Sequence, residues 1–111
     1  MCINSKQKYD LQELASRIEF DKEDYIPLLE AYIDQTVLDL EEIERKRISG
    51  NEKAISERIH NIKGAALNLG LGEIIMLLEP LSLLNRSGKF ASMKEILNKC
   101  LDEVDNLKKL L

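Results

Sequence analysis

The segment from residue 52 to residue 70 reads EKAISERIHNIKGAALNLG, and its apolar residues recur at steps of three and four. That spacing is typical of an amphipathic helix, which turns about 100° per residue. Four apolar residues of the segment fall within an arc of about 80° on such a helix: Ile59, Ile62, Ala66 and Leu69. Because Gly70 and Gly72 then interrupt the pattern, we expect a helix over residues 52–69 with this arc facing a core.

Helical periodicity extends over the rest of the chain. Further helices are expected over residues 9–18, 21–48, 73–86 and 91–110. The longest carries one apolar stripe: Leu29, Tyr32, Ile33, Thr36, Leu40 and Ile43. The last carries another: Met93, Ile96, Leu97, Cys100, Leu101, Val104, Leu107 and Leu111. The links between the four longer helices are short, with Ser49-Gly50-Asn51 as the first, so neighbouring helices should run antiparallel.

The composition supports an all-α fold. The 111 residues include 5 glycines, 2 prolines and 5% aromatic residues, which argues against a sandwich, a barrel or a doubly wound sheet. A chain of this length is expected to form one domain. We therefore predict a single domain, residues 1–111. It would be an antiparallel up-and-down four-helix bundle over residues 21–111, preceded by an arm with a short extra helix over residues 1–20.

The composition also excludes several classes of function. Lysine and arginine total 16 and aspartate and glutamate 20, a net charge of -4, which offers no basic surface for nucleic acid. No apolar run approaches the roughly 20 residues of a membrane span. Residues 1–10 lack the apolar region of a secretory signal, so a cytoplasmic protein is expected. The single histidine excludes metal sites built on two imidazoles, and Cys2 and Cys100 are too far apart in sequence for a zinc motif.

His60, the one histidine, lies off the expected core arc. It is about 100° from Ile59 and about 160° from Ile62 around the helix axis, which predicts an imidazole on the bundle surface. Lys63 and Gly64, at i+3 and i+4, are its direct neighbours on that surface. A glycine inside a helix costs roughly 1 kcal/mol relative to alanine. Gly64 therefore indicates that open space beside the imidazole is useful, because another molecule can then come close.

Two leucines extend an apolar strip along the same face. Leu67 is at i+7 and Leu71 at i+11 from the histidine, and exposed apolar residues beside a reactive group suggest docking of a protein partner. Lys63 offers an ammonium to phosphate oxygens. A neutral imidazole nitrogen on an open surface is suited to covalent capture of a phosphoryl group.

The residues alone leave other readings open. In one, the chain is a helical interaction module without phosphoryl chemistry, and His60 is incidental. A metal-storage bundle would need Glu-x-x-His pairs from two helices, whereas Glu57-x-x-His60 occurs once. We therefore expect no metal site in this chain.

The stretch His60-x-x-Lys63-Gly64-Ala65-Ala66-x-x-x-Gly70 resembles the signature of histidine-containing phosphotransfer (HPt) domains, H-x-L-K-G-[SA]-[SA]-x-x-[LIM]-G. The resemblance covers residues 21–110. Leu28-Leu29-Glu30-Ala31-Tyr32 is similar to the preceding family helix, Leu78-Glu79 to a pair in the following helix, and Ser87-Gly88 to its glycine stop. The resemblance implies a four-helix bundle whose histidine accepts a phosphoryl group from one receiver-domain aspartate and passes it to another, in a two-component phosphorelay.

The resemblance also implies a role for each residue of the site. His60 would carry the phosphoryl group on Nε2, Lys63 would steady it, and Gly64 would give the receiver access. The partner-binding surface would be bordered by four residues: Asn61, Leu67, Asn68 and Leu71. The chain would be a phosphoryl carrier and no free-standing enzyme. Its partners would be response-regulator receiver domains and a sensor or hybrid histidine kinase. It would need no cofactor, because Mg²⁺ would belong to the receiver.

Two positions depart from the family pattern. Many members have serine where Ala65 stands, so a hydroxyl contact is absent there. Some members have a glutamine about 22 residues after the histidine that holds the ring or the phosphoryl group. That position is Ser82 here, which is shorter.

Overall fold

The computed structural model describes residues 7–111, which form five α-helices and no strand. The helices are α1 (Leu11–Arg17), α2 (Lys22–Ser49), α3 (Glu52–Asn68), α4 (Gly72–Arg86) and α5 (Met93–Lys108). A 3₁₀ turn, Phe90–Ser92, precedes α5, so the last α-helix begins two residues later than the sequence predicted. The other ends agree with the sequence to within about two residues, the normal uncertainty of a helix boundary.

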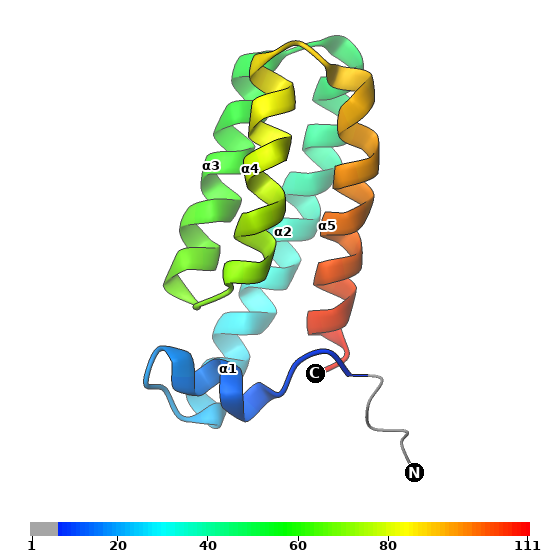
Figure 1. Ribbon diagram of the computed structural model, residues 1–111. Helices are drawn as coiled ribbons and strands as arrows, with labels where there is room; N and C mark the ends of the chain where they lie inside the picture. The colour runs from blue at the N-terminus through cyan, green and yellow to red at the C-terminus, as the bar shows by residue number, and fades with distance from the viewer. Residues whose placement is uncertain (1–6) are drawn as a thin grey trace.

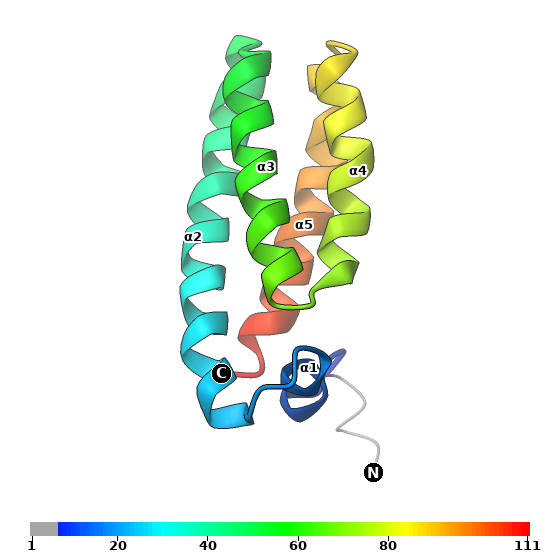
Figure 2. The same ribbon diagram turned by 90° about the vertical axis from the view of Figure 1, so that its left-hand side faces the viewer.

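Helices α2 to α5 form an up-and-down bundle in which each helix packs against two neighbours (Figure 1). Figure 2 shows the pairs α2–α3 and α4–α5 as near-parallel columns. At 28 residues, α2 is about 42 Å long at 1.5 Å per residue, so it extends beyond the ends of the 15- to 17-residue helices around it. The short helix α1 lies across the end of the bundle where α2 begins, beneath the link from α3 to α4. The predicted four-helix bundle is thus confirmed.

The apolar stripes predicted from the sequence form the core. Every residue of the α2 stripe is buried, including Thr36 at 2% exposure, and so is the whole α3 arc. Five residues of the α5 stripe are buried, Met93, Leu97, Cys100, Val104 and Leu107, and Ile96 is half-buried against them. Leu101 and Leu111 lie outside it and are exposed. Burial raises the pKa of Cys100 to about 12, as expected for a thiol that acts as a small apolar side chain, while Cys2 lies outside the described residues.

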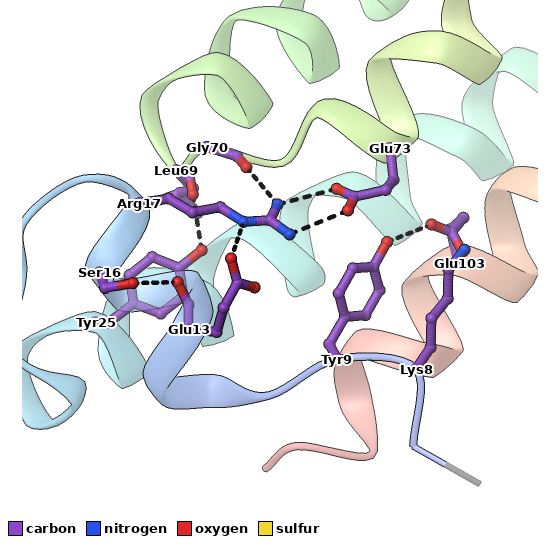
Figure 3. A network of polar contacts seen from close by, with 10 residues as sticks. All are labelled: Lys8, Tyr9, Glu13, Ser16, Arg17, Tyr25, Leu69, Gly70, Glu73 and Glu103. Carbon is purple, nitrogen blue, oxygen red and sulfur yellow. Dashed lines mark hydrogen bonds and ion pairs between the residues drawn. The ribbon is translucent and has the colours of Figure 1, made fainter. Parts of the chain in front are cut away.

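An N-terminal clasp joins α1 to the link between α3 and α4 (Figure 3). The Arg17 guanidinium donates to the Gly70 carbonyl at 2.9 Å and to both carboxylate oxygens of Glu73 at 3.1 Å. The Tyr25 hydroxyl donates to the Leu69 carbonyl at 2.8 Å, and burial raises the pKa of Tyr25 to about 12, so this donor stays protonated. The clasp therefore fixes the chain where α3 ends and α4 begins.

The residues before α1 are held by a second group of contacts. Asp10 caps the helix by accepting from the backbone N–H of Gln12 at 2.9 Å. The Tyr9 hydroxyl donates to Glu103 of α5 at 2.5 Å, and Lys8 pairs with the same carboxylate (Figure 3). The arm is thereby attached to the far end of the chain.

Candidate functional site

His60 stands on the outer face of α3, with its side chain exposed to solvent. Its neighbours Ile59 and Ile62 are only 5% and 1% exposed, so they fix the helix with the histidine turned away from the core. Among residues 7–111 no group makes a hydrogen bond to the imidazole. Both ring nitrogens are therefore available to an incoming molecule, as the helical angle predicted.

Gly64 leaves an empty volume beside the imidazole. A Cβ atom placed on Gly64 would meet nothing within 4 Å, and the backbone there is ordinary right-handed helix. Neither packing nor backbone conformation requires glycine at this position. Leu67, one turn further on, is 60% exposed. His60, Gly64 and Leu67 fall within an arc of about 60° and form the outermost strip of α3.

Lys63 lies toward α4, about 60° from His60 around the helix. Its ammonium pairs with the Glu79 carboxylate of α4, Nζ to Oε2, at 3.0 Å. The two side chains are 43% and 63% exposed, so the pair lies in solvent. Sequence reasoning placed Lys63 correctly beside the histidine, but it did not find this carboxylate, which is 16 residues away in the chain.

The Lys63–Glu79 pair also fixes the level of Ser82 relative to the histidine. The helices α3 and α4 are antiparallel, and His60 is three residues before Lys63 while Ser82 is three residues after Glu79. The two residues therefore lie at the same height on adjacent helices. The Ser82 hydroxyl accepts a hydrogen bond from Arg86 at 3.1 Å.

On its other side, the outer strip of α3 borders a groove against α2. This groove of about 310 Å³ is lined by seven residues: Leu28, Ala31, Tyr32, Gln35, Ala65, Asn68 and Leu69. Asn61 and Asn68 are exposed and lie about 80° to 100° from His60, on the α2 side of the strip. Leu28, at 42% exposure, is a candidate contact that the sequence analysis did not single out. The feature of the sequence that could have identified Leu28 is its position, since it is an apolar residue of α2 that does not belong to the core stripe.

The prediction that Leu71 is exposed on the docking strip is wrong. Leu71 is 2% exposed and belongs to the core. The helix ends at Asn68, and Gly70 takes a left-handed φ of +72°, so the helical angle does not continue to Leu71. The Leu71 N–H instead donates back to the Ala66 carbonyl at 2.9 Å, and the Gly70 N–H to Leu67 at 3.2 Å, which is the Schellman pattern of a helix end.

Other features of the described residues lie elsewhere. A hollow of about 440 Å³ contains no α3 residue and is lined by Lys8, Glu73, Met76, Leu77, Lys99, Asp102 and Glu103. Residues 7–111 contain no group of three potential His, Cys, Asp or Glu metal ligands. No helix in this part of the chain is long and apolar enough to cross a bilayer.

The fold and the site define the class of this protein as a four-helix bundle with an exposed histidine beside a lysine and an unfilled glycine position. Residues 27–110 match the Hpt domain family, so the chain belongs to that family. Hpt domains carry phosphoryl groups in two-component systems and are carriers rather than catalysts. The comparisons with curated proteins and with solved structures gave no match.

Proposed function

We propose that this chain is a phosphorelay intermediate that accepts a phosphoryl group on His60 from a receiver-domain aspartate and passes it to another receiver. The observation that carries the proposal is the exposed imidazole of His60, which accepts or donates no hydrogen bond among residues 7–111, next to the empty position at Gly64. Membership of the Hpt family supports the same role. A sensor or hybrid histidine kinase would supply the phosphoryl group to the first receiver.

The transfer is an in-line displacement at phosphorus. The Nε2 lone pair of the neutral imidazole attacks the aspartyl phosphate, and the N–P bond forms as the P–O bond breaks. The electron pair of that bond returns to the aspartate carboxylate, and the Nδ1 proton stays on the ring until solvent removes it. The reverse sequence delivers the group to the next receiver. Lys63 would steady the phosphoryl oxygens through its ammonium.

The receiver completes the site. A metal ion such as Mg²⁺ belongs in this proposal to the receiver's acidic pocket, and this chain supplies the nucleophile and the docking surface. Gly64 lets the receiver's backbone approach the imidazole. Leu67 and the groove between α2 and α3, with Leu28 at its edge, supply exposed apolar surface for the contact. Asn61 and Asn68 border that surface and offer hydrogen bonds.

The test is to incubate the purified domain with a phosphorylated receiver and to follow the label. The proposal predicts one phosphoryl group per chain, in a linkage that acid cleaves and alkali does not. His60→Gln should abolish the label and leave the fold intact, because His60 is exposed. Label that persists in His60→Gln would place the acceptor elsewhere.

A second candidate function is an interaction module without phosphoryl chemistry. The exposed Leu67 and Leu28 beside the groove favour it, since this surface does not depend on the histidine. A domain that binds a receiver equally well with or without His60, and that no phosphorylated receiver labels, would support this alternative over the carrier.

A further inference from the structure

The ion pair between Lys63 and Glu79 places a competitor for the lysine beside the proposed phosphoryl site. Lys63 is one helical turn from His60, and its ammonium is 3.0 Å from the Glu79 carboxylate. The same ammonium would serve the phosphoryl oxygens in the proposed function. The ammonium cannot be fully available to both anions. Glu79 therefore affects the stability of the phosphorylated domain through Lys63.

We propose that Glu79 is a positioning residue that holds Lys63 in the unphosphorylated domain and limits its contact with the phosphoryl group, thereby shortening the lifetime of phosphohistidine and favouring onward transfer. This inference rests on the proposed function of His60. It concerns how strongly the carrier retains its phosphoryl group.

The exposure of the pair determines how large this effect can be. Both side chains are in solvent, at 43% and 63% exposure. The paired state of an exposed ion pair is only slightly more stable than the separated state. A phosphoryl group carries more negative charge than a carboxylate and sits on the same helix face, so the ammonium can leave Glu79 for it. The carboxylate therefore reduces the strength of the contact between Lys63 and the phosphoryl group without preventing it.

The phosphohistidine decays when water attacks phosphorus: an O–P bond forms as the N–P bond breaks, and the electron pair of the N–P bond returns to Nε2. The group leaves as inorganic phosphate, and the proton of the attacking water passes to solvent. Transfer to a receiver breaks the same bond, with an aspartate oxygen as the attacking group. In a loose, metaphosphate-like transition state the phosphoryl oxygens carry less negative charge than they do in the phosphohistidine. An ammonium bound to those oxygens therefore stabilises the phosphorylated domain more than it stabilises the transition state or the products of either reaction. Removing the competing carboxylate should therefore lengthen the lifetime and move the equilibrium with the receiver toward His60.

The experiment measures the hydrolysis half-life of the phosphorylated domain and its equilibrium with one receiver. Glu79→Gln should lengthen the half-life and shift the equilibrium toward His60, each by about two- to fivefold, the range set by a solvent-exposed pair. The same substitution in a Lys63→Gln background should change neither. Glu79 is exposed, so the variants should fold as the wild type does.

Glu57 provides the matched control. It is an exposed carboxylate one turn before His60 on α3, and it makes no ion pair among residues 7–111. Glu57→Gln removes the same charge without releasing Lys63, so it should have a smaller effect than Glu79→Gln.

Three results would overturn the inference: no change in Glu79→Gln, an equal change when Lys63 is absent, or an equal change in Glu57→Gln. Failure of the proposed function would look different, because the wild-type domain would then carry no label on His60 at all.

Discussion

Replacing Gly64 should make the domain more stable and a poorer carrier. A Cβ at Gly64 meets nothing within 4 Å, so Gly64→Ala adds no clash. The substitution removes the helix-interior penalty of glycine, which is about 0.8–1.0 kcal/mol. For a domain of this size, the melting temperature should rise by roughly 3–6 °C.

Gly64→Gln should show the same change in stability and a clearer loss of function. The longer side chain occupies the open volume beside His60 and obstructs the receiver's backbone. The assay combines thermal unfolding with the initial rate of transfer from a phosphorylated receiver. A variant that unfolds at a higher temperature but transfers several-fold more slowly is the expected result.

Gly70 is the matched control for these glycine substitutions. Its φ is +72°, and a Cβ there would lie 3.2 Å from the Arg17 Cβ, so Gly70→Ala should destabilise by at least about 1 kcal/mol. Wild-type transfer rates in Gly64→Gln would refute the steric argument. A lower melting temperature in Gly64→Ala would refute the claim that the position is open.

The two leucines of the motif should separate binding from stability. Leu67→Asp should weaken receiver binding and change the free energy of unfolding by no more than about 0.5 kcal/mol, measured by titration and by denaturant unfolding. Leu71→Ala should cost about 2–5 kcal/mol because it removes a buried side chain, and a neutral result would contradict its place in the core. The clasp should weaken in acid, because hydrogen bonds from Arg17 hold the pKa of Glu73 below its usual 4.5. The stability that the ionised Glu73 carboxylate contributes is complete above pH 4.5 and is lost as the pH falls through the lowered pKa. Amide exchange of α1 should follow that loss in the wild type, and Glu73→Gln should remove this part of the pH dependence.

The sequence was sufficient to predict most of the features that depend on one helix at a time, although Leu101, which the periodicity assigned to the α5 stripe, is exposed. The stripe of α2 and the arc of α3 follow from a period of 3.6 residues, and every member of both is buried. The exposure of His60 follows from the same period, since the apolar arc of α3 fixes the direction of every other side chain. Gly64 was likewise assigned an open position correctly, because its neighbours on the helix surface were known.

The features that the sequence did not predict depend on where a helix ends or how two helices are aligned. Leu71 was misplaced because the helical angle was extended past the left-handed turn at Gly70. The Lys63–Glu79 pair depends on the register of α3 against α4, which no single-helix pattern contains. The bond from Tyr9 to Glu103 joins residues 94 positions apart, so it follows only from the packed bundle.

The central claim is tested most directly by a two-receiver relay. One receiver is phosphorylated, a second is not, and the domain is added in amounts well below either. Passage of label to the second receiver at a rate proportional to the amount of domain, and none with His60→Gln, is the predicted result. A rate that is the same with the wild type, with His60→Gln or with no domain would contradict the role of His60 as the carrier.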